Sequence, residues 1–223
     1  LHHFLWYSYD DEKRAYHEDF LNYYRQIDGL IDKIAVSFRN LTGGDEGFYV
    51  LSDHGFCGID LEVYLNAWLE KEGYLKFSTP APTGLEDIGE ESAAFALDPN
   101  RIYLNLREKF PKGIVASSEA ESLKKEISQK LEKLEFEGRK VVRRVFDSRD
   151  IYSGPYLSLG PDLIALAEHG FDLKGSVKKK EIFGRTNLQG MHTWDDAFFW
   201  ANRAVGENLA ISNLAGIILE NFR

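Results

Sequence analysis

The feature that most constrains this chain is a short apolar segment followed directly by two side chains of types that commonly bind metal ions. Phe48–Leu51 has the composition of a buried strand, and Ser52, Asp53, His54 and Gly55 follow it directly. Open α/β sheets gather ligands where their strands end, and a carboxylate beside an imidazole is a common pair of metal ligands. This order therefore predicts an α/β fold with a candidate metal site at the end of the strand.

The composition is that of an ordinary globular protein. The 223 residues are enough for one sizeable domain or two small ones. The net charge of −9 disfavours general nucleic-acid binding, and no apolar run approaches the ~20 residues that a membrane helix needs. The single Cys57 excludes an internal disulfide and fits a reducing compartment. We therefore expect a cytoplasmic protein with no specific nucleic-acid or membrane partner.

Helix-like and strand-like segments alternate along the chain, which predicts a mixed α/β fold. Apolar spacing predicts helices over 11–39, 60–72, 117–135 and 208–222. Asp10 or Asp11 would cap the first helix, and Gly73 would end the second. Strands are expected over 48–51, 93–97, 101–106, 141–146, 161–167 and 197–200. The predicted parts are a metal-binding core over 1–75, an inserted lobe or cap over 76–160, and a core part over 161–223 that returns to the metal site.

Histidines near other apolar segments extend the candidate site. His2 and His3 lie in the apolar start of the chain, and His192 directly precedes the last predicted strand. If the start is a strand, His2 and His3 point in opposite directions. Asp195 and Asp196 could hold the His192 imidazole by hydrogen bonds, although an exposed turn explains them equally well. Hydrolytic sites often pair two such metal ions about 4 Å apart, while the alternative for each histidine is an ordinary hydrogen-bonded residue.

These motifs resemble the C-terminal part of the type I phosphodiesterase/nucleotide pyrophosphatase family, in the alkaline phosphatase superfamily. The resemblance spans nearly the whole chain and is carried by Val50–Phe56, Asn66–Leu75, Ile102–Leu106 with Gly113–Val115, Gly190–His192 and Ile211–Ala215. The start of the chain is similar to the family segment Asp-Arg-x-x-His-x-Phe with its first two residues cut off. The resemblance implies an alkaline phosphatase-like mixed sheet flanked by helices, with the N-terminal strands and the nucleophile region missing from this chain.

The resemblance also implies a set of ligands. His3 and His192 would hold one metal ion, together with an aspartate upstream of the chain. Asp53 and His54 would hold the second ion. The family spacing favours His3 over its neighbour as the ligand. The two ions would be zinc, with manganese or iron as alternatives, and a Thr or Ser nucleophile would lie upstream of Leu1.

The implied reaction is hydrolysis of a phosphodiester or a nucleotide pyrophosphate. A hydroxyl would attack the phosphorus in line, and water would then hydrolyse the covalent phospho-enzyme. The partner would be a small phosphate ester or a nucleotide. Because the chain contains no assignable nucleophile, the alternative is a non-catalytic module of the same fold that binds a phosphate ester or a partner. A phosphomutase or sulfatase is a third interpretation. Uncovered sheet edges would favour self-association or pairing with the missing N-terminal segment.

Overall fold

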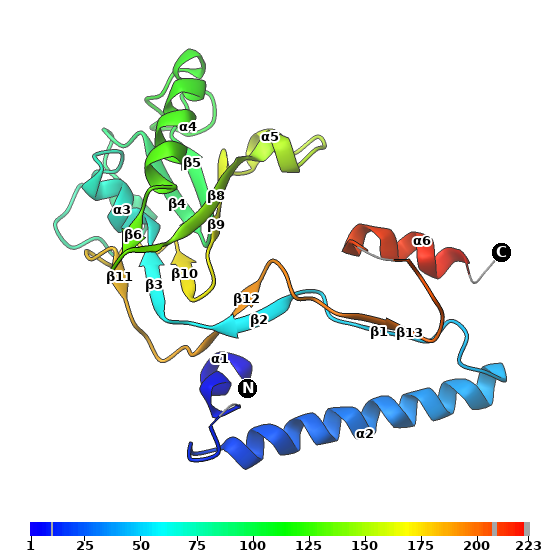
Figure 1. The fold of residues 1–223 in the computed structure, drawn as a ribbon. Coiled ribbons are helices and arrows are strands. Elements are labelled where there is room, and N and C mark those ends of the chain that lie inside the picture. The colour runs from blue at the N-terminus through cyan, green and yellow to red at the C-terminus, as the bar shows by residue number, and fades with distance from the viewer. Residues whose placement is uncertain (10, 207–208, 221–223) are drawn as a thin grey trace. The chain divides into compact units, whose positions relative to one another are not determined.

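The computed structural model describes residues 1–9, 11–206 and 209–220, and the chain divides into two compact units. The first unit comprises Leu1–Gly58 and Leu188–Arg223, and the second comprises Ile59–Asn187. Helices and strands alternate along the chain (Figure 1), and the described strands form five small sheets. The predicted mixed α/β class is therefore confirmed. The lobe predicted over 76–160 falls wholly within the second unit.

The described residues of the first unit form one long helix, two pairs of strands and several short helical segments. Its helices are α1 (His2–Leu5), α2 (His17–Thr42) and α6 (Leu214–Leu219), with 3-10 turns at Trp6–Ser8 and Ile211–Asn213. Its strands pair antiparallel, β1 (Tyr49–Leu51) with β13 (Phe199–Ala201) and β2 (Gly55–Gly58) with β12 (Gly190–Thr193). The helix predicted over 208–222 is thus represented by α6 and the turn before it, while residues 208, 221 and 222 lie outside the described residues.

Both ends of α2 differ from the predicted helix over 11–39, because the helix begins at His17 and ends at Thr42. Tyr16, directly before the helix, has a left-handed backbone with φ of 70°. Asp11 lies in an earlier turn, where its carboxylate accepts a hydrogen bond from the Lys13 N–H at 3.0 Å. The alternative cap, Asp10, lies outside the described residues. Gly43, with φ of 80°, ends the helix, because glycine adopts this conformation without a side-chain penalty.

The second unit contains two larger sheets and a small hairpin. One sheet has the order β10 (Phe171–Lys174), β3 (Leu61–Tyr64) and β11 (Phe183–Gly184). The other has the order β4 (Ala94–Asp98), β5 (Arg101–Leu104), β9 (Leu163–Ala167) and β8 (Val142–Asp147). The hairpin pairs β6 (Glu135–Phe136) with β7 (Arg139–Lys140). The helices are α3 (Leu65–Lys71), α4 (Ser117–Leu131) and α5 (Ser148–Ile151), with 3-10 turns at Leu85–Asp87 and Leu157–Leu159.

One predicted helix is partly a strand. The segment Leu61–Tyr64 forms β3, which runs parallel to β10, instead of the first turn of a helix over 60–72. All four residues of β3 are buried, and a strand buried on both faces lacks the alternating pattern that would distinguish it from a helix. The helix itself, α3, ends near Gly73, whose φ of 86° agrees with its predicted role as a helix stop.

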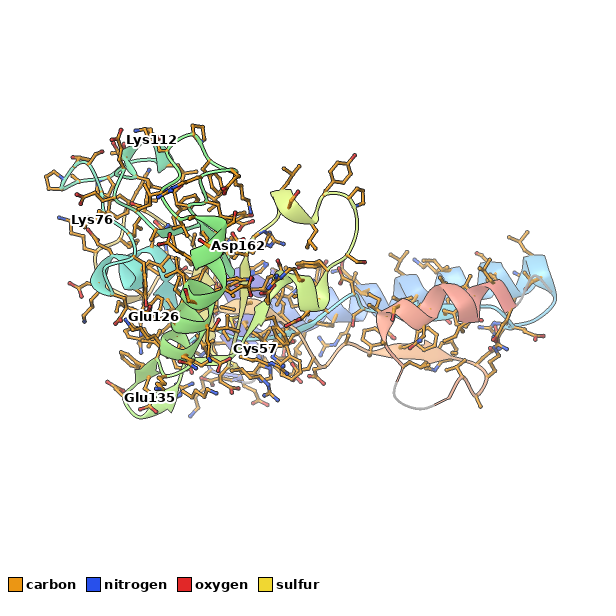
Figure 2. The ribbon with its side chains drawn as sticks, turned by 90° about the horizontal axis from the view of Figure 1, so that it is seen from above. Cys57, Lys76, Lys112, Glu126, Glu135 and Asp162 are labelled. Atoms are coloured by element: carbon orange, nitrogen blue, oxygen red, sulfur yellow. The ribbon has the colours of Figure 1, made fainter. Side chains whose placement is uncertain are left out.

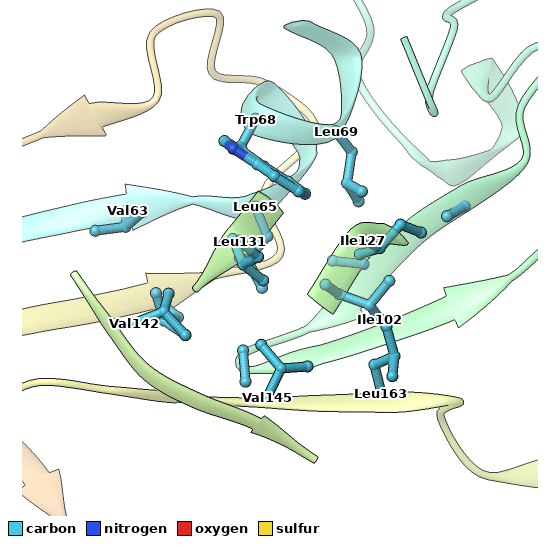
Figure 3. Close-up of a cluster of buried hydrophobic side chains, with 14 of the residues drawn as sticks. Val63, Leu65, Trp68, Leu69, Ile102, Ile127, Leu131, Val142, Val145 and Leu163 are labelled. Atoms are coloured by element: carbon cyan, nitrogen blue, oxygen red, sulfur yellow. The ribbon is translucent and has the colours of Figure 1, made fainter. Parts of the chain in front are cut away.

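The hydrophobic core lies in the second unit (Figure 3). Side chains from α3 and α4 meet side chains from both larger sheets, and Leu65, Leu69, Ile102, Leu131 and Val142 among them are fully buried. Charged side chains cover the surface of this unit (Figure 2), among them Lys76, Lys112, Glu126 and Glu135. In the described part of the chain, no helix combines the length and the apolar character needed to cross a membrane.

Candidate metal centre

The strand pair β2–β12 brings the predicted ligands together. Asp53 and His54 directly precede β2, and His192 lies within β12, opposite Phe56 of β2. The sequence placed His192 before an apolar strand, and the structure corrects this by placing it inside a strand of its own. The sequence pattern of a strand is weak at β12, because the strand is only four residues long, starts at Gly190 and has an exposed histidine near its centre.

Gly55 is a glycine because another segment passes directly over it. A Cβ atom at this position would lie 2.0 Å from the carbonyl oxygen of Asp195 and 2.4 Å from Oγ1 of Thr193. Neither distance is compatible with a real side chain. The Thr193 hydroxyl in turn donates a hydrogen bond to the Asp195 carbonyl at 2.8 Å. The glycine that follows Asp53–His54 therefore permits the close approach of the His192 segment, which differs from the turning role expected from the sequence.

Three imidazoles from three segments of the first unit form one group. The His54 and His192 rings stack with their centroids 3.9 Å apart and an interplanar angle of 29°. The His3 ring packs against His192 with a centroid distance of 5.0 Å. Asp53 adds a carboxylate, since its Oδ1 lies 3.4 Å from Nε2 of His54. The four residues predicted as metal ligands are therefore neighbours.

Backbone carbonyls define the tautomers of two of these histidines. Nδ1 of His3 lies 2.7 Å from the Gly190 carbonyl, and Nδ1 of His54 lies 2.9 Å from the Gly55 carbonyl. A carbonyl oxygen only accepts hydrogen bonds, so Nδ1 carries the proton in each neutral ring and Nε2 presents a lone pair. Metal-binding histidines are commonly oriented by such a bond through the other ring nitrogen. Both rings are therefore prepared to bind a cation through Nε2.

The Asp53–His54 pair fits one half of a metal site. In the neutral tautomer, His54 Nε2 and Asp53 Oδ1 are both acceptors, yet they lie only 3.4 Å apart. A cation or a proton between them would satisfy both. Two ligands on one tetrahedral zinc, with bonds of about 2.0–2.1 Å, lie about 3.3 Å from each other. The observed separation is close to that value.

The two histidines at the start of the chain have different surroundings. They lie in a helical turn, α1, so the strand considered for this segment is wrong. His2 packs against Phe20, and its Nε2 lies 2.5 Å from the Tyr24 hydroxyl. Burial lowers the pKa of His2, and the neighbouring His3 lowers it further. His2 is thus engaged with α2, whereas His3 packs against His192.

The structure gives Asp195 and Asp196 backbone roles beside His192. The Asp195 carbonyl accepts the Thr193 hydroxyl described above, and Asp196 has a left-handed backbone with φ of 64°. Left-handed residues outside glycine occur mostly in tight turns. The backbone bends at Trp194 and Asp195, and a bond from either carboxylate to the His192 imidazole stays a prediction.

The ligand sets are incomplete within the described part of the chain. Over residues 1–9, 11–206 and 209–220, no group of three or more His, Cys, Asp or Glu side chains has the arrangement needed to hold a metal ion. The two pairs supply two protein ligands each, whereas a catalytic zinc usually has three. The residues present therefore fit half of each coordination sphere.

The fold and this site together define a mixed α/β protein with a cluster of histidines and a carboxylate beside a strand pair. The family model of type I phosphodiesterase / nucleotide pyrophosphatase matches residues 1–195, and the chain belongs to this family. The family resemblance stated above is thereby confirmed, and membership indicates a hydrolase of the phosphodiesterase/pyrophosphatase type. No curated protein and no solved structure matches the chain.

Proposed function

We propose that this chain provides part of a two-metal centre that hydrolyses phosphodiesters or nucleotide pyrophosphates. His3 and His192 bind one ion, and Asp53 and His54 bind the other. The observation that carries the proposal is the stacking of His54 on His192 at 3.9 Å, because it sets the two ligand pairs beside each other. Paired ions in hydrolytic sites lie about 4 Å apart, which suits neighbouring ligand pairs. Zinc is the proposed metal, and manganese or iron would suit the same ligands.

In this mechanism, the residues of the chain would bind the metal ions and hold the ligand side chains in the orientation that binding requires. The Gly190 and Gly55 carbonyls hold His3 and His54 so that each Nε2 lone pair is presented. The ions, when bound, would stabilise negative charge on the attacking and leaving oxygens of a phosphate ester or nucleotide. We propose that the attacking Thr or Ser hydroxyl, and a further carboxylate ligand for each ion, come from a segment upstream of Leu1. The alkaline phosphatase-like arrangement and the cytoplasmic location are parts of the same proposal.

The first test is the metal content of the protein. Protein that carries the proposed upstream segment would be gel-filtered after a chelator-free preparation and analysed by elemental mass spectrometry, and close to two equivalents of a transition metal are expected per chain. His192→Ala and Asp53→Ala should each lose metal, because each removes one of only two ligands that the chain supplies to an ion. His169→Ala, in the second unit, is the matched control and should keep the wild-type content. Full metal content in both site variants would contradict the ligand assignment.

A second candidate function is a non-catalytic module that binds a phosphate ester. The observation that favours it is the lack of any group of three or more metal-type side chains among the described residues. Turnover separates the two candidates. With metal supplied, the hydrolase should cleave a phosphodiester such as bis(4-nitrophenyl) phosphate faster than the matching monoester or sulfate ester. Binding of the phosphodiester without turnover would favour the non-catalytic module.

A further inference from the structure

The imidazole of His3 is carried by a helical turn that is too short to be stable alone. α1 has four residues, and a 3-10 turn of three residues follows it directly. Isolated helices of this length do not persist in water, so contacts with other segments must fix both turns. The backbone breaks between them at Leu5, the last residue of α1, whose φ of −128° is not helical. The contacts of these two turns therefore decide where the His3 ring lies.

The segment directly before β12 binds both turns through one residue, Gln189. Its backbone N–H donates a hydrogen bond to the His3 carbonyl at 2.6 Å. Its side-chain carbonyl, Oε1, accepts the Tyr7 N–H at 3.2 Å. The first N–H groups of a helical turn have no acceptor within the turn, so this side chain caps the second turn. Gln189 therefore joins the two turns on either side of the break at Leu5.

The next residue, Gly190, supplies a third contact, to the ring itself. The Nδ1–H of His3 donates to the Gly190 carbonyl at 2.7 Å. A Cβ atom at Gly190 would lie 2.9 Å from the His2 carbonyl oxygen and 2.3 Å from Cε1 of Phe56, so only glycine lets α1 lie this close to β12. Figure 1 shows α1 next to this strand pair. Hydrogen bonds of this kind span only about 2.7–3.2 Å. A displacement of α1 by about 1 Å would therefore break the bond that orients the ring.

We propose that Gln189 is a positioning residue for His3. By joining both turns to the start of β12, it keeps the Nδ1–H of His3 on the Gly190 carbonyl and the Nε2 lone pair available for a cation. The half-buried Gln189 is not itself one of the proposed ligands, so it acts through the orientation of the His3 ring. The consequence for metal binding rests on the proposed function, in which His3 and His192 hold one ion.

Nitrogen-15 NMR of the histidine rings tests this orientation without any metal. In the chain with EDTA at about pH 8, where an ordinary imidazole is neutral, the spectra report which ring nitrogen carries the proton. Gln189→Met keeps the length of the side chain and removes the acceptor. We expect His3 to change from a single Nδ1–H form to a mixture of both tautomers. His54 should keep its Nδ1–H form, because its bond to the Gly55 carbonyl involves no residue of α1.

Two further variants separate the hydrogen bond from other effects of the substitution. Gln189→Glu retains an oxygen that accepts the Tyr7 N–H, so it should keep the single tautomer of His3. Gln26→Met makes the same chemical change as Gln189→Met on the exposed surface of α2 and should behave as the wild type. An unchanged His3 in Gln189→Met, equal changes at His3 and His54, or a mixture of tautomers in Gln189→Glu would each overturn the proposal.

Metal binding gives a second measurement, which separates this proposal from the proposed function. Cobalt(II) would be titrated into protein that carries the proposed upstream segment and followed by its visible absorption. Gln189→Met should weaken the binding of one ion by about tenfold, the lower end of the usual effect when a contact that orients a ligand is lost, and leave the other ion unchanged. Unchanged affinity for both ions, in a protein whose His192→Ala variant loses one, would overturn the proposal. If His192→Ala retains both ions, the ligand assignment of the proposed function is wrong, and a change of the His3 tautomer in Gln189→Met would still confirm the role of Gln189.

Discussion

The two units of this chain differ in how they bury their apolar residues. In the second unit, α3, α4 and two sheets enclose one continuous core, whose members include Leu65, Ile102 and Leu131 at 0% exposure. In the first unit, α2 carries an apolar stripe of which Phe20 is fully buried, while Leu30 and Ile34 are 52% and 50% exposed. Burial of apolar surface is the main source of folding free energy. The second unit therefore contributes most of the stabilising free energy of the chain.

The candidate metal ligands, in contrast to the hydrophobic core, lie in the first unit. The clustered imidazoles of His3, His54 and His192 lie in the first unit, on the short strand pair β2–β12 and its flanks. Functional groups are commonly drawn from regions of low local stability. The contrast therefore indicates that substitutions in the second unit act mainly on folding, while substitutions in the first act mainly on the site.

Two leucines on long helices give the strongest test of this contrast. Leu131 on α4 is fully buried, and Leu30 on α2 is 52% exposed. Leu131→Ala should lower the free energy of unfolding by about 2–5 kcal/mol, because it removes buried methyl groups and leaves a cavity. Leu30→Ala makes the same chemical change and should cost less than about 0.5 kcal/mol. Urea unfolding followed by circular dichroism measures both, and similar losses in the two variants would contradict the comparison.

Two asparagines make the same comparison for hydrogen bonds. Asn66, fully buried, accepts the Ala96 N–H at 2.8 Å and donates to the Ala96 and Gly175 carbonyls at 2.8 and 2.9 Å. Asn66→Ala leaves these backbone groups without partners and should cost about 2–3 kcal/mol. Asn22 on α2 is exposed and accepts from Arg25, so Asn22→Ala should change stability by less than about 0.5 kcal/mol. The same unfolding measurement applies, and a small loss in Asn66→Ala would show that the segments it joins are held by other contacts.

Helices, strands and turns with strong local signals were predicted correctly from the sequence. Strand pairings between distant segments were not. The strands over 93–97 and 101–106 form the hairpin β4–β5, and the turn between them has Asn100 at φ of 68°. The helix over 117–135 is α4, whose Glu119 carboxylate accepts the Ala116 N–H at 3.0 Å at its start. Asparagine in turns and acidic residues at helix starts act through local contacts, so sequence alone displays them.

Other features depended on partners distant in sequence. β3 was mistaken for helix because its burial comes from pairing with β10 more than a hundred residues later. The segment over 48–51 was expected to be buried, yet Leu51 in β1 is 41% exposed.

Within the candidate site, Asp53, His54 and His192 could be selected from their positions next to apolar segments. The choice of His3 over His2 rested on the family resemblance. The contacts among these ligand-type residues, and the reason for Gly55, required the register of β2 with β12, which no local pattern shows.

A pair of glycines tests whether that register positions the site. Gly55→Ala would force its Cβ to within 2.0 Å of the Asp195 carbonyl, so β12 must shift, at a cost of about 1–3 kcal/mol. We expect the pairs Asp53–His54 and His3–His192 to bind metal more weakly, with little change in the core of the second unit. Elemental mass spectrometry measures the metal content. Gly44 has no atom within 4 Å of an added Cβ, so Gly44→Ala should behave as the wild type. Unchanged metal content in Gly55→Ala would show that the register of β2 with β12 does not position the metal ligands.

The smallest expected effect concerns Tyr64, in the second unit. Its hydroxyl donates to the Glu62 carboxylate at 2.6 Å, and burial together with this hydrogen bond raises the pKa of Tyr64 to about 12. Because an unfolded tyrosine ionises near pH 10, the stability that Tyr64 contributes is complete below about pH 10 and is lost as the pH rises towards 12. Tyr64→Phe should cost about 1 kcal/mol at neutral pH, and its stability should then fall less steeply than that of the wild type above pH 10. Urea unfolding at pH 7, 9 and 11 measures the difference, and parallel profiles for the two proteins would show that the hydroxyl of Tyr64 contributes no pH-dependent stability to this unit.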